Sequence, residues 1–449
     1  MFAAALTAQA QQGGISGEML NQIKQSYKAT PADKAIRNAL GGTSINTLAL
    51  NQENRADFDT EFSHKVLSKG ITDQQSSGRC WLFTGLNVLR SQMIAKYGLD
   101  EMEFSQNYCF FYDQLEKANL FLQGIIDTSG KPMDDKMVEW LFKHPLSDGG
   151  QFTGVSDIIE KYGLVPKSAM VETFSSENTG KMSSLIGLKL KEFGLQLREA
   201  AAAGVKPVEL EKKKTKMLGT VYRMLVLTLG EPVSTFTWSL KGGEAKEYTP
   251  VSFYKEFLGN DLTNNYVMLM NDPSREFYKC YEIDFDRHRY DGKNWTYVNL
   301  PIEDIKEIAI ASIKDSTMMY FSCDVGKFLD SKRGLLDPDN YDYESLMGTT
   351  FGMDKKQRIQ TFSSGSSHAM TLMAVDLDKA GKPKKWMVEN SWGSASGYRG
   401  HLIMTDKWFD EYMFRVVAEK KYVPAKVLDI LKQKPIRLPA WDPMFADEE

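Results

Sequence analysis

The chain has 449 residues, of which 42% are hydrophobic and 25% charged, which is enough for about two or three subdomains around a substantial core. Its formal net charge of −4 gives no general attraction to DNA or RNA, so we expect no nucleic-acid partner. No apolar run approaches the roughly 20 residues of a membrane-spanning helix, and four cysteines do not indicate a disulfide framework.

The chain begins with an alanine-rich segment that resembles the second half of a signal peptide. Residues 8–10 fit the small-x-small pattern of a cleavage site, although a positively charged region is missing before them. We expect residues 1–14 to be a signal-peptide remnant or a disordered start. Export to the periplasm is favoured over a cytoplasmic location, which is the alternative. A helical arm is predicted at 16–27.

A cysteine stands at the start of the next strongly periodic segment. The apolar pattern of a helix includes Trp81, Leu82, Phe83, Leu86, Leu89, Met93 and Ile94. Because free N–H groups and the positive dipole end lie at a helix N-terminus, they favour the nucleophilic thiolate of Cys80. The side chain of Gln74, together with the backbone N–H of Cys80, can donate to an oxyanion. A buried structural cysteine is the alternative.

Helices continue through the middle of the chain. Ser105 is a suitable N-cap for a helix that contains Phe110 and Phe111. The segment from 173 to about 229 is rich in Lys, Glu, Leu, Met and Ala, and we expect a helical insertion there. Helical spacing within it is shown by Met182, Leu185, Leu188, Leu190 and Phe193.

The C-terminal half reads as short strands near 317–323, 370–375, 385–389 and 398–404. His368 precedes one of these strands and Asn390 follows another. A cysteine nucleophile needs a base, and the base needs an orienting group. Asn390 can accept a hydrogen bond from one ring nitrogen of His368, which leaves the other for Cys80, and Trp392 can shield that bond from water. For His368 alone, a core histidine is the alternative.

The order Cys80, His368, Asn390 and the flanking residues resemble the papain clan of cysteine peptidases. Ser77 and Arg79 depart from its Cys-Gly-Ser/Ala-Cys-Trp/Tyr signature, and both departures match the bleomycin hydrolase and aminopeptidase C branch. The match continues in 103–106, 148–151, 161–167, 271–273, 323–327 and 438–444. Cys80 and His368 are 288 residues apart, against roughly 130–150 in papain-like enzymes, which indicates an insertion of about one small domain.

The resemblance implies an α+β fold of the papain-like two-lobe type. Its helical lobe carries the nucleophile, its antiparallel β-barrel-like lobe carries His368 and Asn390, and substrate lies between them. The expected fold also contains a helical insertion and a C-terminal arm that lies in the active-site cleft. The N-terminal arm and helical lobe are expected at 15–172, after the start at 1–14. The helical insertion is expected at 173–231, the β-rich lobe at 232–435 and the C-terminal arm at 436–449.

The resemblance also implies where substrate binds. Gly149 and Gly150 match a glycine pair whose backbone pairs with extended substrate, and a simple turn is the alternative. In the enzymes that this chain resembles, the terminal carboxylate of the tail meets the substrate's α-ammonium group. That places Glu449 at the substrate, along with Trp392, although the acidic ending departs from the family's small, apolar one. A frayed acidic tail is the alternative.

The sequence thus predicts a cysteine aminopeptidase that removes N-terminal residues from peptides through a thiolate–imidazolium pair and an acyl-enzyme thioester. The alternatives are a papain-like endopeptidase with a mobile tail and a catalytically silent oligomeric scaffold. The resemblance implies a homohexamer. We expect no cofactor and no metal, because no histidine has metal-ligand spacing to a cysteine.

Overall fold

The computed structural model describes residues 13–54, 59–294 and 296–444. Two compact units divide the chain: one comprises Met1–Ala56 and Tyr341–Phe351, the other Asp57–Asn340 and Gly352–Glu449. These two units have different boundaries from the five segments expected from the sequence, which stay predictions. The expected signal-peptide remnant falls almost entirely outside the described residues. Within the described ranges, no helix is both long and apolar enough to cross a membrane.

The first unit consists of short helices, which are α1 (Gly17–Ser26), α2 (Pro31–Leu40), α3 (Ile45–Ala49) and α13 (Tyr343–Met347). Helix α1 confirms the predicted arm at 16–27, and Ser16 caps it by accepting from the backbone of Met19. Thr30 and Asp33 form a capping box at the start of α2. These local bonds fix the helix starts, because neither α1 nor α2 buries a residue.

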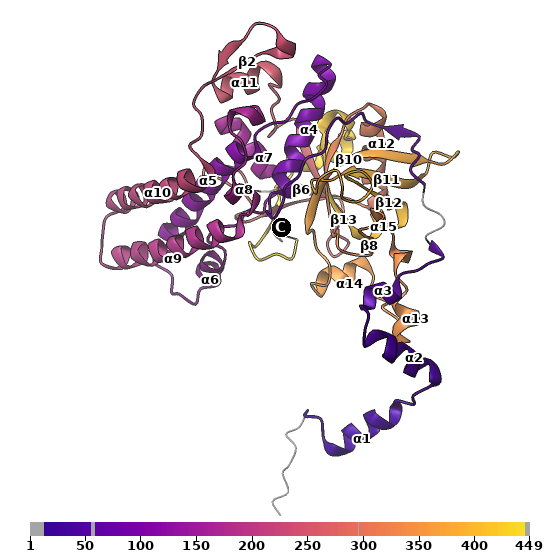
Figure 1. The fold of residues 1–449 in the computed structure, drawn as a ribbon. Coiled ribbons are helices and arrows are strands. Elements are labelled where there is room, and N and C mark those ends of the chain that lie inside the picture. Colours follow the sequence, from indigo (N-terminus) through magenta and orange to yellow (C-terminus); the bar gives the residue numbers. More distant parts are fainter. Residues whose placement is uncertain (1–12, 55–58, 295, 445–449) are drawn as a thin grey trace, which may run out of the picture. The chain divides into compact units, whose positions relative to one another are not determined.

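The second unit contains a group of helices and a large sheet (Figure 1). This group of helices consists of α4 (Cys80–Tyr97), α5 (Gln106–Asp127), α6 (Lys136–Lys143), α7 (Phe152–Tyr162), α8 (Phe174–Glu177), α9 (Gly180–Ala202), α10 (Pro207–Leu229) and α11 (Pro250–Phe257). Ser105 caps α5 as predicted, since its Oγ accepts from the N–H of Tyr108 at 3.0 Å. Helix α4 is buried over most of its length, and the polar Thr84, Asn87 and Arg90 are buried along with its apolar residues.

Helices α9 and α10 lie in the segment where a helical insertion was expected, and both pack against α5. The buried face of α9 is formed by Met182, Ile186 and Leu190, at a spacing of four residues. Leu185 and Leu188 are exposed by 48% and 67%. The spacing in the sequence therefore predicted the helix correctly, but the residues that showed it lie partly on its buried face and partly on its exposed face.

Within the described part of the chain, the large sheet has 12 strands. They are β1 (His64–Lys65), β4 (Tyr266–Met270), β5 (Lys279–Ile283), β6 (Thr296–Asn299), β7 (Met319–Cys323), β8 (Leu329–Asp330), β9 (Leu335–Leu336), β10 (His368–Leu377), β11 (Pro383–Glu389), β12 (His401–Thr405), β13 (Met413–Glu419) and β14 (Ile436–Leu438). Their order is β14-β5-β6-β4-β13-β7-β10-β11-β12-β9-β8, and β1 pairs with β10. The four predicted strands are confirmed as β7, β10, β11 and β12. The central pairs are antiparallel, whereas β14–β5, β4–β6 and β12–β9 are parallel.

Shorter elements surround the sheet. They are α12 (Ile302–Lys314), α14 (Lys355–Gln360), α15 (Asp406–Tyr412) and α16 (Ala425–Leu428), with a separate hairpin of β2 (Phe236–Trp238) and β3 (Lys246–Tyr248). One hydrophobic core fills the helical group and another fills the sheet. Helix α4 packs against β10 and β7, and Figure 1 shows it beside the sheet. This packing joins the element that begins with Cys80 to the strand that begins with His368.

Candidate active site

Cys80 is the first residue of α4, as the sequence predicted, and its side chain is fully buried. The preceding residue, Arg79, is the N-cap but makes no side-chain cap. At a helix N-terminus, the first N–H groups and the positive end of the dipole favour a nearby anion. Helix α4, which begins with Cys80, packs against β10, which begins with His368.

His368 and Asn390 make the hydrogen bond that their sequence context predicted. Nε2 of His368 lies 2.8 Å from Oδ1 of Asn390, and the same oxygen accepts from the N–H of Ser391 at 2.8 Å. Because Oδ1 can only accept, Nε2 is the donor, and in the neutral ring Nδ1 is left as the proton acceptor. The Trp392 ring lies 4.7 Å from the imidazole, centroid to centroid, so it covers one side of the pair.

Burial controls the charge of His368. It lowers the pKa of the imidazole to about 4, and the bond to Asn390 acts in the opposite direction. An imidazolium is therefore costly here unless a negative charge lies beside it. A neighbouring thiolate is the kind of charge that would offset this cost.

Gln74 is held by Ser391, the neighbour of Asn390. The N–H of Gln74 donates to the Ser391 carbonyl at 2.8 Å, and Oγ of Ser391 donates to Oε1 of Gln74 at 2.6 Å. Nε2 of Gln74 donates to the carbonyl of Ser77 at 2.7 Å. A primary amide has two N–H groups, so one remains for an oxyanion. These contacts bring Gln74, His368 and Asn390 together around the loop that leads to Cys80.

The glycine pair packs tightly against Trp81, the residue that follows Cys80. Nζ of Lys117 donates to the Gly149 carbonyl at 2.5 Å, and Nε1 of Trp81 donates to the Asp148 carbonyl at 2.9 Å. A Cβ at Gly150 would lie 2.3 Å from Cε1 of His288, so a side chain does not fit there. Both glycines line a cavity of about 360 Å³.

The C-terminal arm, described as far as Met444, lies beside the loop that leads to His368. Its residues 440–443 and the loop 363–367, which leads to His368, line a cavity of about 520 Å³. Asp442 forms an ion pair with Arg275, and Met444 is buried with its carbonyl bound by Arg415. Glu449, predicted to meet the substrate amine, lies outside the described residues.

Several residues of this region were not assigned a role from the sequence. Arg79 and Glu172 form a buried ion pair, and Oδ2 of Asp148 accepts from the N–H of Gly78 at 2.8 Å. The only signal in the sequence was the unusual arginine before the nucleophile, because the partners lie far away along the chain. Among the described residues, no cluster of His, Cys, Asp or Glu is arranged to hold a metal ion.

Comparisons with known proteins identify the family. The model of the Peptidase C1-like family matches residues 14–445. Human bleomycin hydrolase is 37% identical, over 96% of this chain and 98% of its own. Aminopeptidase C of Lactobacillus delbrueckii is 34% identical, over 96% and 98%.

A solved structure gives the same result. The crystal structure of PepW from Lactobacillus rhamnosis superimposes with a TM-score of 0.92 and 36% identity, over 97% of this chain and 100% of that one. This confirms the papain-like α+β fold predicted from the sequence. The chain therefore belongs to the Peptidase C1-like family, in its bleomycin hydrolase and aminopeptidase C branch.

Proposed function

We propose that Cys80 and His368 are the catalytic pair of this papain-like cysteine aminopeptidase, a hydrolase of peptide bonds. The observation that carries the proposal is the bond of 2.8 Å between Nε2 of His368 and Oδ1 of Asn390. It leaves Nδ1 for the thiol, and the element that begins with Cys80 packs on the strand that begins with His368.

The reaction proceeds in two steps. Cys80 transfers its proton to His368, and the thiolate attacks the peptide carbonyl carbon to form a C–S bond. The oxyanion receives hydrogen bonds from Gln74 and from the N–H of Cys80. As the C–N bond breaks, His368 gives its proton to the leaving amine, and a thioester remains. His368 then takes a proton from water, whose oxygen displaces the thiolate and releases the acid.

The exopeptidase specificity arises at the C-terminal arm. The arm reaches the loop before His368, and the ion pair of Asp442 with Arg275 holds it there. We propose that Glu449 continues into the cleft and pairs with the substrate's α-ammonium group, while the backbone of Gly149 and Gly150 and the ring of Trp392 contact the peptide. Curated relatives named aminopeptidases C, G and W support this specificity.

Two further proposals concern the whole protein. We propose a homohexamer, as the resemblance to this branch implies, and sedimentation of the purified protein would test it. We also propose export to the periplasm, from the signal-peptide-like start of the chain. Cell fractionation would test that location against the cytoplasm.

The decisive experiment compares matched peptides with free and acetylated N-termini. We expect efficient release of the first residue from the free peptide and little cleavage of the acetylated one. Cys80→Ala protein, checked for folding by circular dichroism, serves as the control for contaminating peptidases. Equal rates on both peptides, with cleavage at internal bonds, would instead indicate the endopeptidase. Absence of cleavage of either peptide would indicate the silent scaffold.

A further inference from the structure

Arg79 carries a charge in a place where the chemistry described above does not need one. It immediately precedes Cys80, is fully buried, and does not cap α4 with its side chain. The papain signature has a small residue at this position. Burying a guanidinium is costly unless it is paired and hydrogen-bonded. The structure must therefore hold this charge with specific partners.

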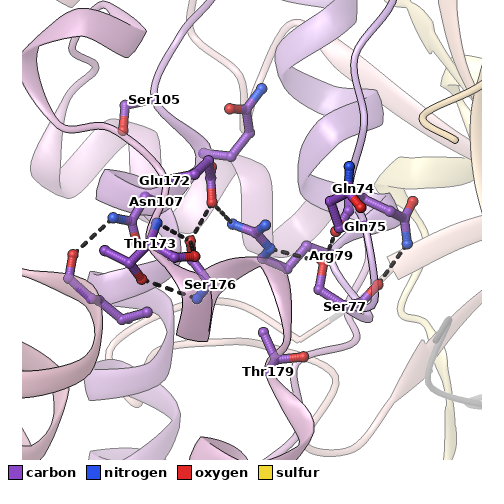
Figure 2. Close-up of polar contacts among 12 residues, drawn as sticks. Gln74, Gln75, Ser77, Arg79, Ser105, Asn107, Glu172, Thr173, Ser176 and Thr179 are labelled. Carbon is purple, nitrogen blue, oxygen red and sulfur yellow. Dashed lines mark hydrogen bonds and ion pairs between the residues drawn. The ribbon is translucent and has the colours of Figure 1, made fainter. Parts of the chain in front are cut away.

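Those partners fix the guanidinium from several directions. Its Nη1 lies 2.9 Å from Oε2 of Glu172, and its Nε donates to Oγ of Ser77 at 3.0 Å. The rings of Phe83 and Phe110 lie 5.2 and 5.3 Å from its central carbon. Figure 2 shows the two polar contacts, with Arg79 between Glu172 on one side and Ser77 on the other. A lysine has no fork that reaches both partners.

The contact with Ser77 leads directly to the proposed oxyanion donor. Since Nε of Arg79 donates to Oγ of Ser77, the hydroxyl proton is directed to the Gln74 carbonyl, 2.6 Å away. The carbonyl of Ser77 in turn accepts from Nε2 of Gln74 at 2.7 Å. Between them, Gln75 has a φ of +54°, which a residue other than glycine adopts only when its surroundings impose it. The loop therefore depends on bonds that hold both of its ends.

Glu172 is itself held by the helical segment that follows it. Oγ of Ser176 in α8 donates to Oε2 of Glu172, and Thr173, the cap of α8, donates to the carbonyl of Thr228 in α10 at 2.8 Å. The carbonyl of Glu177 accepts from the N–H of Ser76 at 3.0 Å. The ion pair thus connects the loop 74–77 to helix α8, whose cap is bound to α10.

We propose that Arg79, bound by Glu172, is a positioning residue for the oxyanion donor. It sets the hydroxyl of Ser77, which holds the backbone and side chain of Gln74 in the orientation that the transition state needs. The inference rests on the proposed function, in which Gln74 donates to the oxyanion. Its effect reaches the chemical step through Ser77 and Gln74.

The test uses Arg79→Met and Ser77→Ala, each alone and combined with Gln74→Ala. Each single change should lower kcat on a free-amino peptide by about tenfold, with KM altered less than about twofold, because only a transition-state interaction is impaired. In Ser77→Ala, which removes no charge, alkylation of Cys80 by iodoacetamide should keep its rate, because displacement at a saturated carbon develops no oxyanion. In the Gln74→Ala background, neither change should lower kcat further by more than about twofold.

A matched control separates positioning from loss of stability. Lys306 of α12 is buried and pairs with Asp406 at 2.7 Å and with Asp410 at 2.5 Å, so Lys306→Met removes another buried cation together with its ion pairs. We expect it to lower the unfolding temperature but not kcat. If Arg79→Met does not fold, Ser77→Ala carries the test, because it removes a single hydroxyl. Glu172→Gln, which keeps the acceptor oxygen, should lower kcat less than Arg79→Met.

The outcomes separate this inference from the proposed function. Unchanged kcat in Ser77→Ala, or a full additional loss in the Gln74→Ala background, overturns the role of Arg79 alone. Unchanged kcat in Gln74→Ala overturns the oxyanion role and this inference together. Retained activity in folded Cys80→Ala protein overturns the proposed function as a whole.

Discussion

Oδ1 of Asn390 accepts two hydrogen bonds of 2.8 Å each, one from Nε2 of His368 and one from the N–H of Ser391. The second bond holds the amide in the orientation in which it can accept the first. Because Ser391 also binds Gln74, one short turn of chain fixes the tautomer of His368 and the position of the Gln74 side chain.

Cys80→Ala and His368→Ala should each abolish peptidase activity while the protein stays folded. The two side chains act as a unit, so the double variant should lose little more than either single one. The measurement is kcat/KM on a free-amino peptide, with circular dichroism as the check of folding. Substantial activity in Cys80→Ala protein would contradict the role of the thiol.

Asn390→Ala should reduce kcat less than His368→Ala does. Asn390 orients the imidazole but transfers no proton, so the loss should fall below the roughly 10²–10⁴-fold that acid–base catalysis contributes. Asn390→Asp keeps an acceptor oxygen and should retain more activity than Asn390→Ala. Equal losses in Asn390→Ala and His368→Ala would point to a more direct role of the amide.

The charge state of His368 should be visible in stability measurements on Cys80→Ala protein, which has no thiolate. Burial lowers the pKa of His368 from 6.5 to about 4. Between these values the unfolded chain binds a proton that the folded protein does not. The free energy of unfolding should therefore fall as pH decreases from 6.5 to 4, by about 3 kcal/mol.

Urea unfolding of Cys80→Ala and of Cys80→Ala/His368→Gln across this pH range isolates that contribution. The double variant lacks the imidazole but titrates identically elsewhere. The difference in unfolding free energy between the two should change with pH in the stated direction. A constant difference would show that burial does not disfavour the imidazolium.

Deletion of residues 445–449 should weaken the preference for free N-termini. The ratio of kcat/KM for free and acetylated peptides should fall by about tenfold or more, since a charge-assisted hydrogen bond contributes about 1.5–3 kcal/mol. A full-length variant with Asp447→Asn and Glu448→Gln keeps the terminal carboxylate and should keep the preference. An unchanged ratio after deletion would exclude the tail as partner of the amine.

Gly150→Ala should lower both activity and stability. Its Cβ would lie 2.3 Å from His288 and 2.9 Å from Trp81, so the wall of the cleft must move, at about 1–3 kcal/mol. Gly219→Ala is the matched control, because a Cβ there meets nothing within 4 Å and the residue is in the helix α10. That change should stabilise the protein by about 0.5–1 kcal/mol. Thermal unfolding and kcat/KM distinguish the two variants.

Local sequence was enough to predict the main elements around the site. The start of α4 at Cys80, the cap at Ser105 and the strands that begin or end near His368 and Asn390 follow from periodicity and capping, which depend on neighbours a few residues away. The same short segments carry the residue types that cysteine chemistry needs. Their meeting in one place was predicted from the family resemblance rather than from any local pattern.

Only the tertiary structure decided which residues hold those groups in place. Arg79 and Glu172 are 93 residues apart, and Arg275 and Asp442 are 167 apart, so no period in the sequence links them. Leu185 and Leu188 are exposed although they have helical spacing, because neighbouring elements determine which face of a helix is covered. The sequence by itself determined the reactive groups, since their chemistry is intrinsic. The folded chain determined their orientation, because buried charges and amides must find partners wherever packing places them.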